Sequence, residues 1–262
     1  MNIMRVWAII VKFWFDTKRD MFRLFDVFWW PAFNLFVWGL LSTYLTQLSK
    51  GSVNFVLLFL AGTIFWSFFD RASRDISRSM VEELWSRNLP NLFSTPLTLT
   101  EYLAGVLTVA FVKLVIGSIF LLVLSKIFYG FEISLLGWPV IGIMAGLMIF
   151  GWSVSFFIQS FVLRYGHTVE VFIWAVTVLL QPFSCVFYPL SALPVWAQWV
   201  ARAFPSMYLF EQMRAIISGT PVRSGDIMIS MALNAVYLIL SVIFFYRTFR
   251  YAKSNGLLTK PY

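Results

Sequence analysis

The sequence predicts an all-α integral membrane protein: one domain over residues 1–262 with six transmembrane helices. Hydrophobic residues make up 60% of the 262 residues and charged residues only 12%, whereas about one quarter of a soluble domain is charged. Apolar runs of roughly 20 residues, each long enough to cross a hydrocarbon core of ~30 Å, recur along the chain. Short polar stretches separate these runs, which favours short loops between spans.

Residues 1–22 are assigned to an amphipathic helix at the membrane surface. At about 100° per residue, polar and apolar side chains of this segment fall on opposite stripes. The polar stripe holds Arg5, Lys12, Asp16 and Arg19, and the apolar stripe holds Ile3, Trp7, Ile10 and Trp14. Such a helix either braces a docking site or simply anchors the chain to the membrane.

The six predicted spans follow this helix in order. They cover about Val27–Leu45, Val53–Phe69, Tyr102–Ile127, Leu135–Phe161, Val169–Tyr188 and Ile227–Tyr246. A proline in the first turn of the first span is tolerated there, and Pro182 predicts a kink in the fifth.

Two features inside the spans have alternative interpretations. Lys113 lies near the middle of the third span, where a charge is costly unless it is paired or hydrated. It is therefore a candidate functional residue, or it snorkels or caps helix carbonyls within the bundle. Gly142 and Gly146 form a GxxxG pair that allows close helix approach, and packing within one subunit is favoured over a dimer seam.

The longest polar stretch, residues 70–101, contains nine of the 32 charged residues. It is predicted to begin with a polar connection after the second span and to contain a short charged helix, Met80–Arg87. A proline-broken connection, Asn88–Pro96, follows. A transport protein without its own source of energy needs a docking surface for a partner that supplies it, and this cytoplasmic stretch is the candidate.

The segment between the fifth and sixth spans is too apolar and aromatic for a solvated loop. Prolines divide residues 189–217 into two short helical pieces, Val195–Ala203 and Met207–Ile217, neither long enough to span. A re-entrant helical hairpin buried against protein fits this pattern. Glu211 and Arg214 are three residues apart and can face each other.

The distribution of basic residues predicts the orientation. With both termini on one side, 14 of the 20 Lys and Arg residues fall on that side, five fall on the other, and Lys113 lies in a span. Because cytoplasmic loops carry the excess of positive charge, both termini and residues 70–101 are expected in the cytoplasm. The same bias accounts for the net charge of +8 without nucleic acid as a partner.

Catalytic and energy-coupling motifs are missing from the sequence. It contains no GxxxxGK[ST] loop for ATP, and no cofactor or metal is predicted for this chain. Its single histidine, His167, falls in a predicted loop. No nucleophile or metal cluster supports a membrane-embedded enzyme. The predicted spans hold almost no acidic residues, which disfavours proton-driven transport.

Two regions carry a resemblance to a known family. The first is Glu82-Glu83-Leu84-Trp85-Ser86-Arg87 through Ser94-Thr95-Pro96-Leu97, followed by Glu101-Tyr102-Leu103-Ala104-Gly105. The second runs from Phe187-Tyr188-Pro189 through Leu193-Pro194-Val195-Trp196 to Phe204-Pro205 and Glu211-x-x-Arg214. In order and spacing the chain resembles ABC transporter permeases of the ABC-2 type over nearly its whole length. It departs from the family pattern at Leu84-Trp85, where Gly-Thr is usual, and at Phe204, where Asn is usual.

The resemblance implies a permease subunit of an ATP-driven exporter. Two copies would form the pore in the inner (plasma) membrane, and two ATPase subunits carrying ATP and Mg would dock below. The implied ATPase-coupling residues are Glu82, Glu83, Trp85, Arg87 and Pro96. The implied extracellular gate or exit comprises Phe187, Tyr188, Pro189, Pro194, Trp196, Pro205, Glu211 and Arg214.

The substrate implied is an amphipathic drug-like or lipid-like molecule or a lipid-linked polysaccharide. Aromatic side chains of the gate region, Phe183 and Trp199 among them, either line an exit or face lipid at the interface. The alternative function is an ATP-independent channel or secondary transporter, for which Lys113 would be the first residue to test.

Overall fold

Helices form all the regular structure in the described part of the chain. The computed structural model describes residues 1–49, 55–169 and 171–256. Five helices are long and apolar enough to cross a membrane: α2 (Met21–Leu48), α3 (Phe55–Trp85), α5 (Leu99–Tyr129), α6 (Pro139–Tyr165) and α10 (Ser224–Ser254). The prediction of a helical, multi-pass membrane protein is confirmed.

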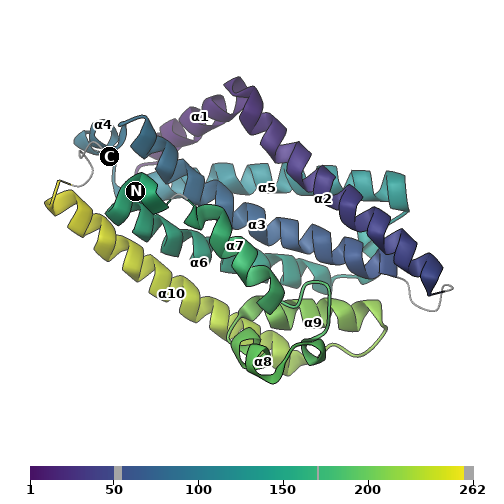
Figure 1. Cartoon of the computed structure of the whole chain (residues 1–262). Helices are drawn as coiled ribbons and strands as arrows, with labels where there is room; N and C mark the ends of the chain where they lie inside the picture. Colours follow the sequence, from purple (N-terminus) through teal and green to yellow (C-terminus); the bar gives the residue numbers. More distant parts are fainter. Residues whose placement is uncertain (50–54, 170, 257–262) are drawn as a thin grey trace.

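Shorter helices connect and flank the five long ones (Figure 1). They are α1 (Ile3–Arg19), α4 (Leu89–Ser94), α7 (Phe172–Phe183), α8 (Val195–Arg202) and α9 (Pro205–Ile217), with 3-10 turns η1 (Ile133–Leu136), η2 (Gly166–Val169) and η3 (Leu190–Ala192). Val53, at which the second span is predicted to begin, and Glu170, the second residue of the fifth predicted span, lie outside the described residues.

The fifth predicted span differs from the other five. Its helix, α7, has only 12 residues, about 18 Å at 1.5 Å per residue, which is short of a ~30 Å hydrocarbon core. The helix ends at Phe183, just after Pro182, and Cys185 adopts a positive φ of 55°. The six-span count therefore stays a prediction.

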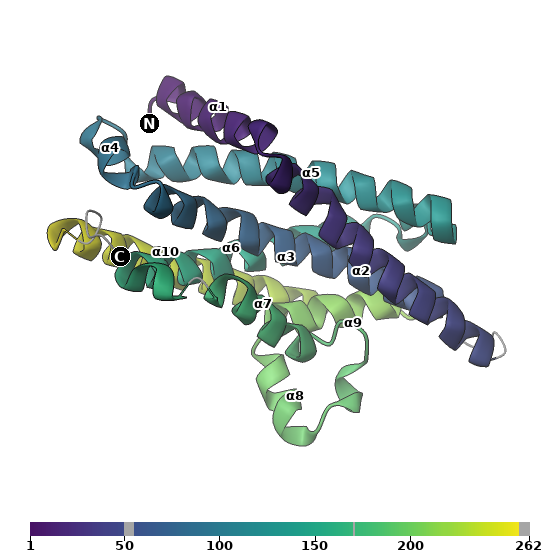
Figure 2. The same cartoon turned by 45° about the horizontal axis from the view of Figure 1, so that its top comes forward.

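Beyond α7 the chain turns into the two helices predicted within residues 189–217. They are α8 and α9, with bounds close to those predicted. The Ser184 and Ser206 hydroxyls lie 2.8 Å apart where α7 ends and α9 begins. Figure 2 shows α8 standing away from the bundle. A re-entrant arrangement in the membrane remains a prediction.

The largest correction concerns α3. The predicted second span ends at Phe69 and a separate charged helix begins at Met80, but α3 is continuous for 31 residues to Trp85. Its polar second half stays helical because much of it is buried against neighbouring helices, including Arg71, Ser77 and Glu83. The helix stops where Arg87 takes a positive φ of 51° and the Asn88 amide donates back to Glu83 O.

A seam of small residues joins α3 to α6. A Cβ added at Gly151 would lie 2.8 Å from Phe69 O and 2.8 Å from Ala72 Cβ, so the two backbones approach closely. The Ser77 and Ser155 hydroxyls lie 3.0 Å apart across the seam. The two glycines of the predicted GxxxG pair differ from each other. Gly146 packs on Leu209 of α9, whereas a Cβ added at Gly142 would have no atom within 4 Å.

The ends of the helices divide into two groups. Figures 1 and 2 place the start of α1, the short helix α4 and the end of α10 at one end of the bundle. The ends of α2 and α5 lie at the other. The two described termini thus share one end with α4, as the charge distribution predicts, and we call this the α4 end.

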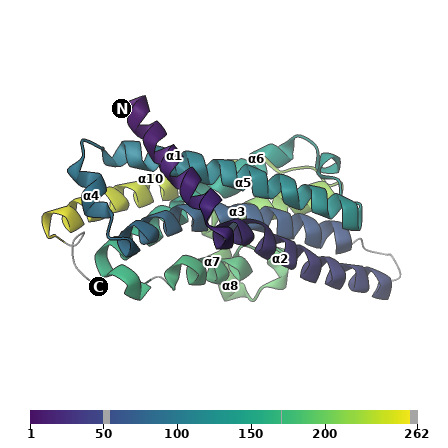
Figure 3. The ribbon, with the colours of Figure 1, turned by 90° about the horizontal axis from the view of Figure 1, so that it is seen from above.

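Helix α1 crosses α5, as seen from above in Figure 3. Ile9 and Phe13 are buried on the inner face of α1, where Ile9 approaches Gly105 of α5. Trp7 and Ile3 are exposed on the outer face, at 63% and 80%. An apolar outer surface on a helix that does not span is the feature expected of the predicted interfacial helix, and that role stays a prediction.

Candidate functional site

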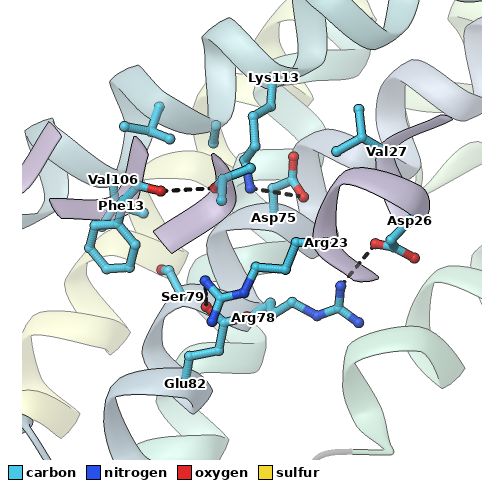
Figure 4. Close-up of a pocket in the computed structure, with 13 residues that line it drawn as sticks. Phe13, Arg23, Asp26, Val27, Asp75, Arg78, Ser79, Glu82, Val106 and Lys113 are labelled. Carbon is cyan, nitrogen blue, oxygen red and sulfur yellow. Dashed lines mark hydrogen bonds and ion pairs between the residues drawn. The ribbon is translucent and has the colours of Figure 1, made fainter. Parts of the chain in front are cut away.

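A cluster of charged side chains from α2, α3 and α5 lies in the half of the bundle that carries α4. Figure 4 shows three ion pairs at its centre. Arg23 Nη1 is 3.1 Å from Glu82 Oε2, Arg78 Nη1 is 2.8 Å from Asp26 Oδ2, and Lys113 Nζ is 3.5 Å from Asp75 Oδ1. These contacts link α2 and α5 to the polar half of α3.

The partner of Lys113 is a carboxylate on α3. Asp75 receives Lys113 on one oxygen, and Arg71 Nη1 lies 3.8 Å from the other. The pair is about 15 Å from the end of α3 and about 21 Å from the start of α5, at 1.5 Å per residue. Lys113 is therefore paired inside the bundle, and a functional role for it stays a prediction.

Sequence reasoning missed Asp75 and its neighbours because it ended the second span at Phe69. A signal was present: Arg71, Arg74 and Arg78 recur at spacings of three and four residues, which places them on one helical face. Asp70 and Asp75 fall at the i,i+4 positions that pair with Arg74 and Arg71. Acidic side chains thus do occur in a helix that contains a candidate span.

Helix α1 is fixed to this region by its polar side chains. Lys12 is ion-paired with Glu83, whose other oxygen accepts a hydrogen bond of 2.8 Å from Asn88 Nδ2. Partial burial lowers the pKa of Lys12, and the nearby carboxylates of Asp16 and Glu82 oppose this shift. The polar stripe predicted from sequence therefore faces protein in part.

A second contact holds the first residues of the chain. The Asn2 amide donates to Glu101 Oε1 at 2.7 Å, and Arg5 Nη1 donates to Pro96 O at 2.5 Å. Glu101 also accepts from the Thr98 amide in a capping box at the start of α5. Both ends of the α3–α5 connection are thus attached to α1.

The predicted ATPase-coupling residues separate into two groups. Glu83 is only 2% exposed and turned toward Lys12, so its expected contact with a docked partner is not supported. Glu82 is half-buried and paired with Arg23. Trp85, Arg87 and Pro96 are exposed around α4. The accessible part of the predicted coupling region is therefore the end of α3 together with α4 and Pro96.

The predicted pair Glu211 and Arg214 lies in the hairpin that α8 and α9 form within residues 189–217. Their side chains meet at 2.9 Å. Arg214 Nη1 also donates to Cys185 O at 2.6 Å, and the Leu190 amide donates to Glu211 Oε1 at 2.7 Å. The pair thereby ties α9 to residues 185–190. It also borders a hollow of about 1190 Å³ together with Pro189.

A family model described as ABC-2 family transporter protein matches residues 36–248. The chain belongs to this family. No match to a curated protein is found. Membership makes the chain a membrane transport component and implies that it works with an ATPase subunit. The match includes α3, α4 and the α8–α9 hairpin, and so both regions that carry the resemblance seen in the sequence.

The predicted gate residues of this ABC-2 transporter protein occupy different environments. Phe187 stacks on Trp38 with ring centroids 4.2 Å apart and on Phe59 at 5.4 Å, so it packs between α2 and α3. Trp196, by contrast, is 66% exposed on α8. The Tyr188 hydroxyl donates to Pro182 O at 2.8 Å. The three rings thus lie in different surroundings, and an exit lined by them stays a prediction.

The prolines of the hairpin set the starts of its helices. Pro194 precedes α8, and Pro205 is the first residue of α9, where a missing amide proton costs nothing. Phe204, which replaces the usual Asn, packs on Phe150 with ring centroids 6.3 Å apart.

Among the described residues, no group of three or more His, Cys, Asp or Glu side chains is arranged to hold a metal ion.

Proposed function

We propose that the chain is the permease subunit of an ATP-driven exporter. The observation that carries the proposal is the family match over residues 36–248, on a chain with five candidate spans and no phosphate-binding loop in its sequence. Two copies of the permease would form the pore, with two ATPase subunits holding ATP and Mg. The protein would lie in the inner membrane with the α4 end in the cytoplasm.

The ATPase would dock at the exposed end of α3 and on α4. Arg87 and Pro96 would offer the accessible contacts, with Trp85 as the aromatic anchor. Glu83 would act indirectly, because its bonds to Lys12 and Asn88 hold the end of α3 against α1. Movement of α4 on ATP binding would then pass into α3.

The substrate would leave near the outer hairpin. The hollow of about 1190 Å³ at this end is lined by apolar side chains such as Leu58 and Met207 and by polar side chains such as Gln198 and Arg223. A drug-like or lipid-like amphiphile or the sugar part of a lipid-linked polysaccharide would suit this mixture of groups. Glu211 and Arg214 would hold the hairpin closed over it.

The first experiment is affinity purification of the tagged chain from its native membrane in a mild detergent, with mass spectrometry of the partners. We expect an ATPase with a phosphate-binding loop in stoichiometric amount. A monodisperse permease that transports without any ATPase would instead establish an ATP-independent channel or carrier.

The docking surface is tested by Arg87→Glu. Because Arg87 is exposed and is not part of the charged cluster, we expect the variant to fold normally. The affinity for the ATPase should fall ~10-fold or more, which corresponds to the loss of one hot-spot contact of ~1.5 kcal/mol. Arg250→Glu, an exposed charge reversal on α10, is the matched control. Equal ATPase recovery from both variants would contradict docking at Arg87.

A further inference from the structure

A second cavity lies beside the charged cluster, between α2, α3 and the start of α7. Its volume is about 380 Å³, within the range of small-molecule sites. Three arginines of α3 line it, Arg71, Arg74 and Arg78, and we call it the arginine pocket. Asp26 and Asp75, which Figure 4 shows with their partners Arg78 and Lys113, belong to its wall.

Each arginine of the pocket has a carboxylate partner among the described residues. Arg78 is paired with Asp26, and Arg74 with Asp70. Asp75 is shared between Lys113 at 3.5 Å and Arg71 at 3.8 Å. Asp75 is thus divided between two cations, and Arg71 has the longest ion-pair distance of the three arginines.

The guanidinium groups also have unused hydrogen-bonding capacity. Arg74 Nε is buried and has no hydrogen-bond acceptor among the described residues. Arg78 bonds Asp26 through one nitrogen, and its side chain is 51% exposed. Donors without an acceptor are unfavourable next to apolar surface, and an oxyanion in the cavity would accept from them. Phosphate, sulfate and carboxylate groups match the planar fork of an arginine.

The rim of the arginine pocket is aromatic. Trp30 of α2, Trp85 of α3 and Trp174 of α7 line it, and each is at least half exposed. Exposed apolar side chains continue from the rim, Phe33 and Val37 along α2 and Val178 along α7. A ligand whose charged group enters the pocket can therefore lay an alkyl chain on this surface.

We propose that the arginine pocket binds an anionic amphiphile, with its oxyanion group among Arg71, Arg74 and Arg78 and its apolar chain along α2 and α7. That this ligand is the exported substrate rests on the transport function proposed above. Binding itself requires neither ATP nor an ATPase partner.

The test uses the full-length permease in phosphatidylcholine nanodiscs without nucleotide. The probe is hexadecyl phosphate with a photoreactive diazirine in its chain, and labelled peptides are identified by mass spectrometry. We expect labelling of the peptides that contain Trp30 and Trp174. Hexadecyl phosphate should compete, whereas hexadecyl phosphocholine and inorganic phosphate should not.

Two variants of one ion pair separate binding from structure. Arg78→Gln removes a ligand-binding cation and should weaken apparent affinity about tenfold. Asp26→Asn breaks the same pair but frees Arg78, so it should strengthen affinity. A purely structural pair would make both variants change in the same direction. Arg250→Gln, which removes an exposed charge that does not line the pocket, should leave labelling unchanged.

Several results would overturn the proposal. Equal competition by hexadecyl phosphocholine would show that the negative charge is not recognised, and equal competition by inorganic phosphate would show that a free oxyanion is the ligand. Absence of labelling, together with a disulfide between two Trp174→Cys subunits, would show that a second copy covers this face. Labelling in the expected pattern, together with failure to recover any ATPase in the affinity purification, would refute the exporter function and keep the site.

Discussion

Asp75 is the residue on which the charged cluster depends. In the described part of the cluster, it is the carboxylate that pairs with two cations, Lys113 and Arg71. Removing it leaves both cations without that partner inside the bundle, whereas removing Lys113 leaves Asp75 still compensated by Arg71. The two halves of one ion pair should therefore differ in their effect on stability.

We predict that Asp75→Asn lowers the free energy of unfolding by about 3 kcal/mol or more, the cost of breaking a buried pair, and that Lys113→Met costs about half as much. The double variant should cost less than the sum, because the residues are coupled. Lys126→Met, which breaks an exposed pair with Glu132, should cost under ~1 kcal/mol. Denaturant unfolding in detergent measures all four, and additive losses would refute the coupling.

At this scale the sequence allowed part of the site to be predicted. Lys113 is a candidate from sequence because a lysine within an apolar run is costly. The pairing of Glu211 with Arg214 is predicted because the two residues are three positions apart on a helix. Asp75 and the arginines were not, because a polar run after a span is normally a loop. Only the neighbouring helices, which bury Arg71 and Glu83, make a continuous helix favourable there.

The seam between α3 and α6 decides how the elements pack. Gly151 permits the close approach, and hydrogen bonds hold the two helices together: Ser77 to Ser155, and Gln159 Nε2 to Ile76 O at 2.5 Å. In a membrane, small residues and interhelical hydrogen bonds replace the hydrophobic driving force. The spaced small residues Ser73 and Ser77, and Gly151 and Ser155, are present in the sequence. Which of these segments face each other depends on the fold, so the sequence did not predict this seam.

Gly151→Ala should therefore destabilise the protein, because the added Cβ would meet the Phe69 carbonyl oxygen at 2.8 Å. We expect a loss of ~1–3 kcal/mol, typical of overpacking. Gly142→Ala is the matched control on the same helix: it meets no atom within 4 Å and should be neutral or stabilise by up to ~1 kcal/mol. Thermal unfolding in detergent distinguishes them, and equal midpoints would contradict the seam.

At the scale of the whole molecule, the proposals for docking and for substrate exit both depend on the orientation of the chain in the membrane. The docking surface and the outer hairpin must face opposite sides of the membrane. Composition and charge were sufficient to predict a multi-pass helical protein and the placement of both termini at one end. They could not predict how the fifth apolar segment divides, because the break after α7 depends on contacts such as Ser184 with Ser206.

Single cysteines introduced into a Cys185→Ser background test this orientation. Ser191 is exposed in the hairpin and Asn91 is exposed on α4. We expect Ser191→Cys to react with an impermeant maleimide in intact cells, and Asn91→Cys to react only after permeabilisation. Cys185 is buried, so the wild-type chain provides the unlabelled baseline. The reverse pattern would invert the topology and remove the docking proposal.

The unbroken course of α3 has a mechanical consequence. With 31 residues, α3 is about 46 Å long, and it contains no proline. It reaches from the α4 end to the segment that precedes the α8–α9 hairpin, where Gly62 of α3 lies against Val186. A continuous helix of this kind has no break or proline kink at which it could bend. A tilt of ~10° would shift one tip by about 8 Å relative to the other over that length. A displacement of Trp85 would therefore tilt the whole of α3 and so move the residues that it contacts in the hairpin.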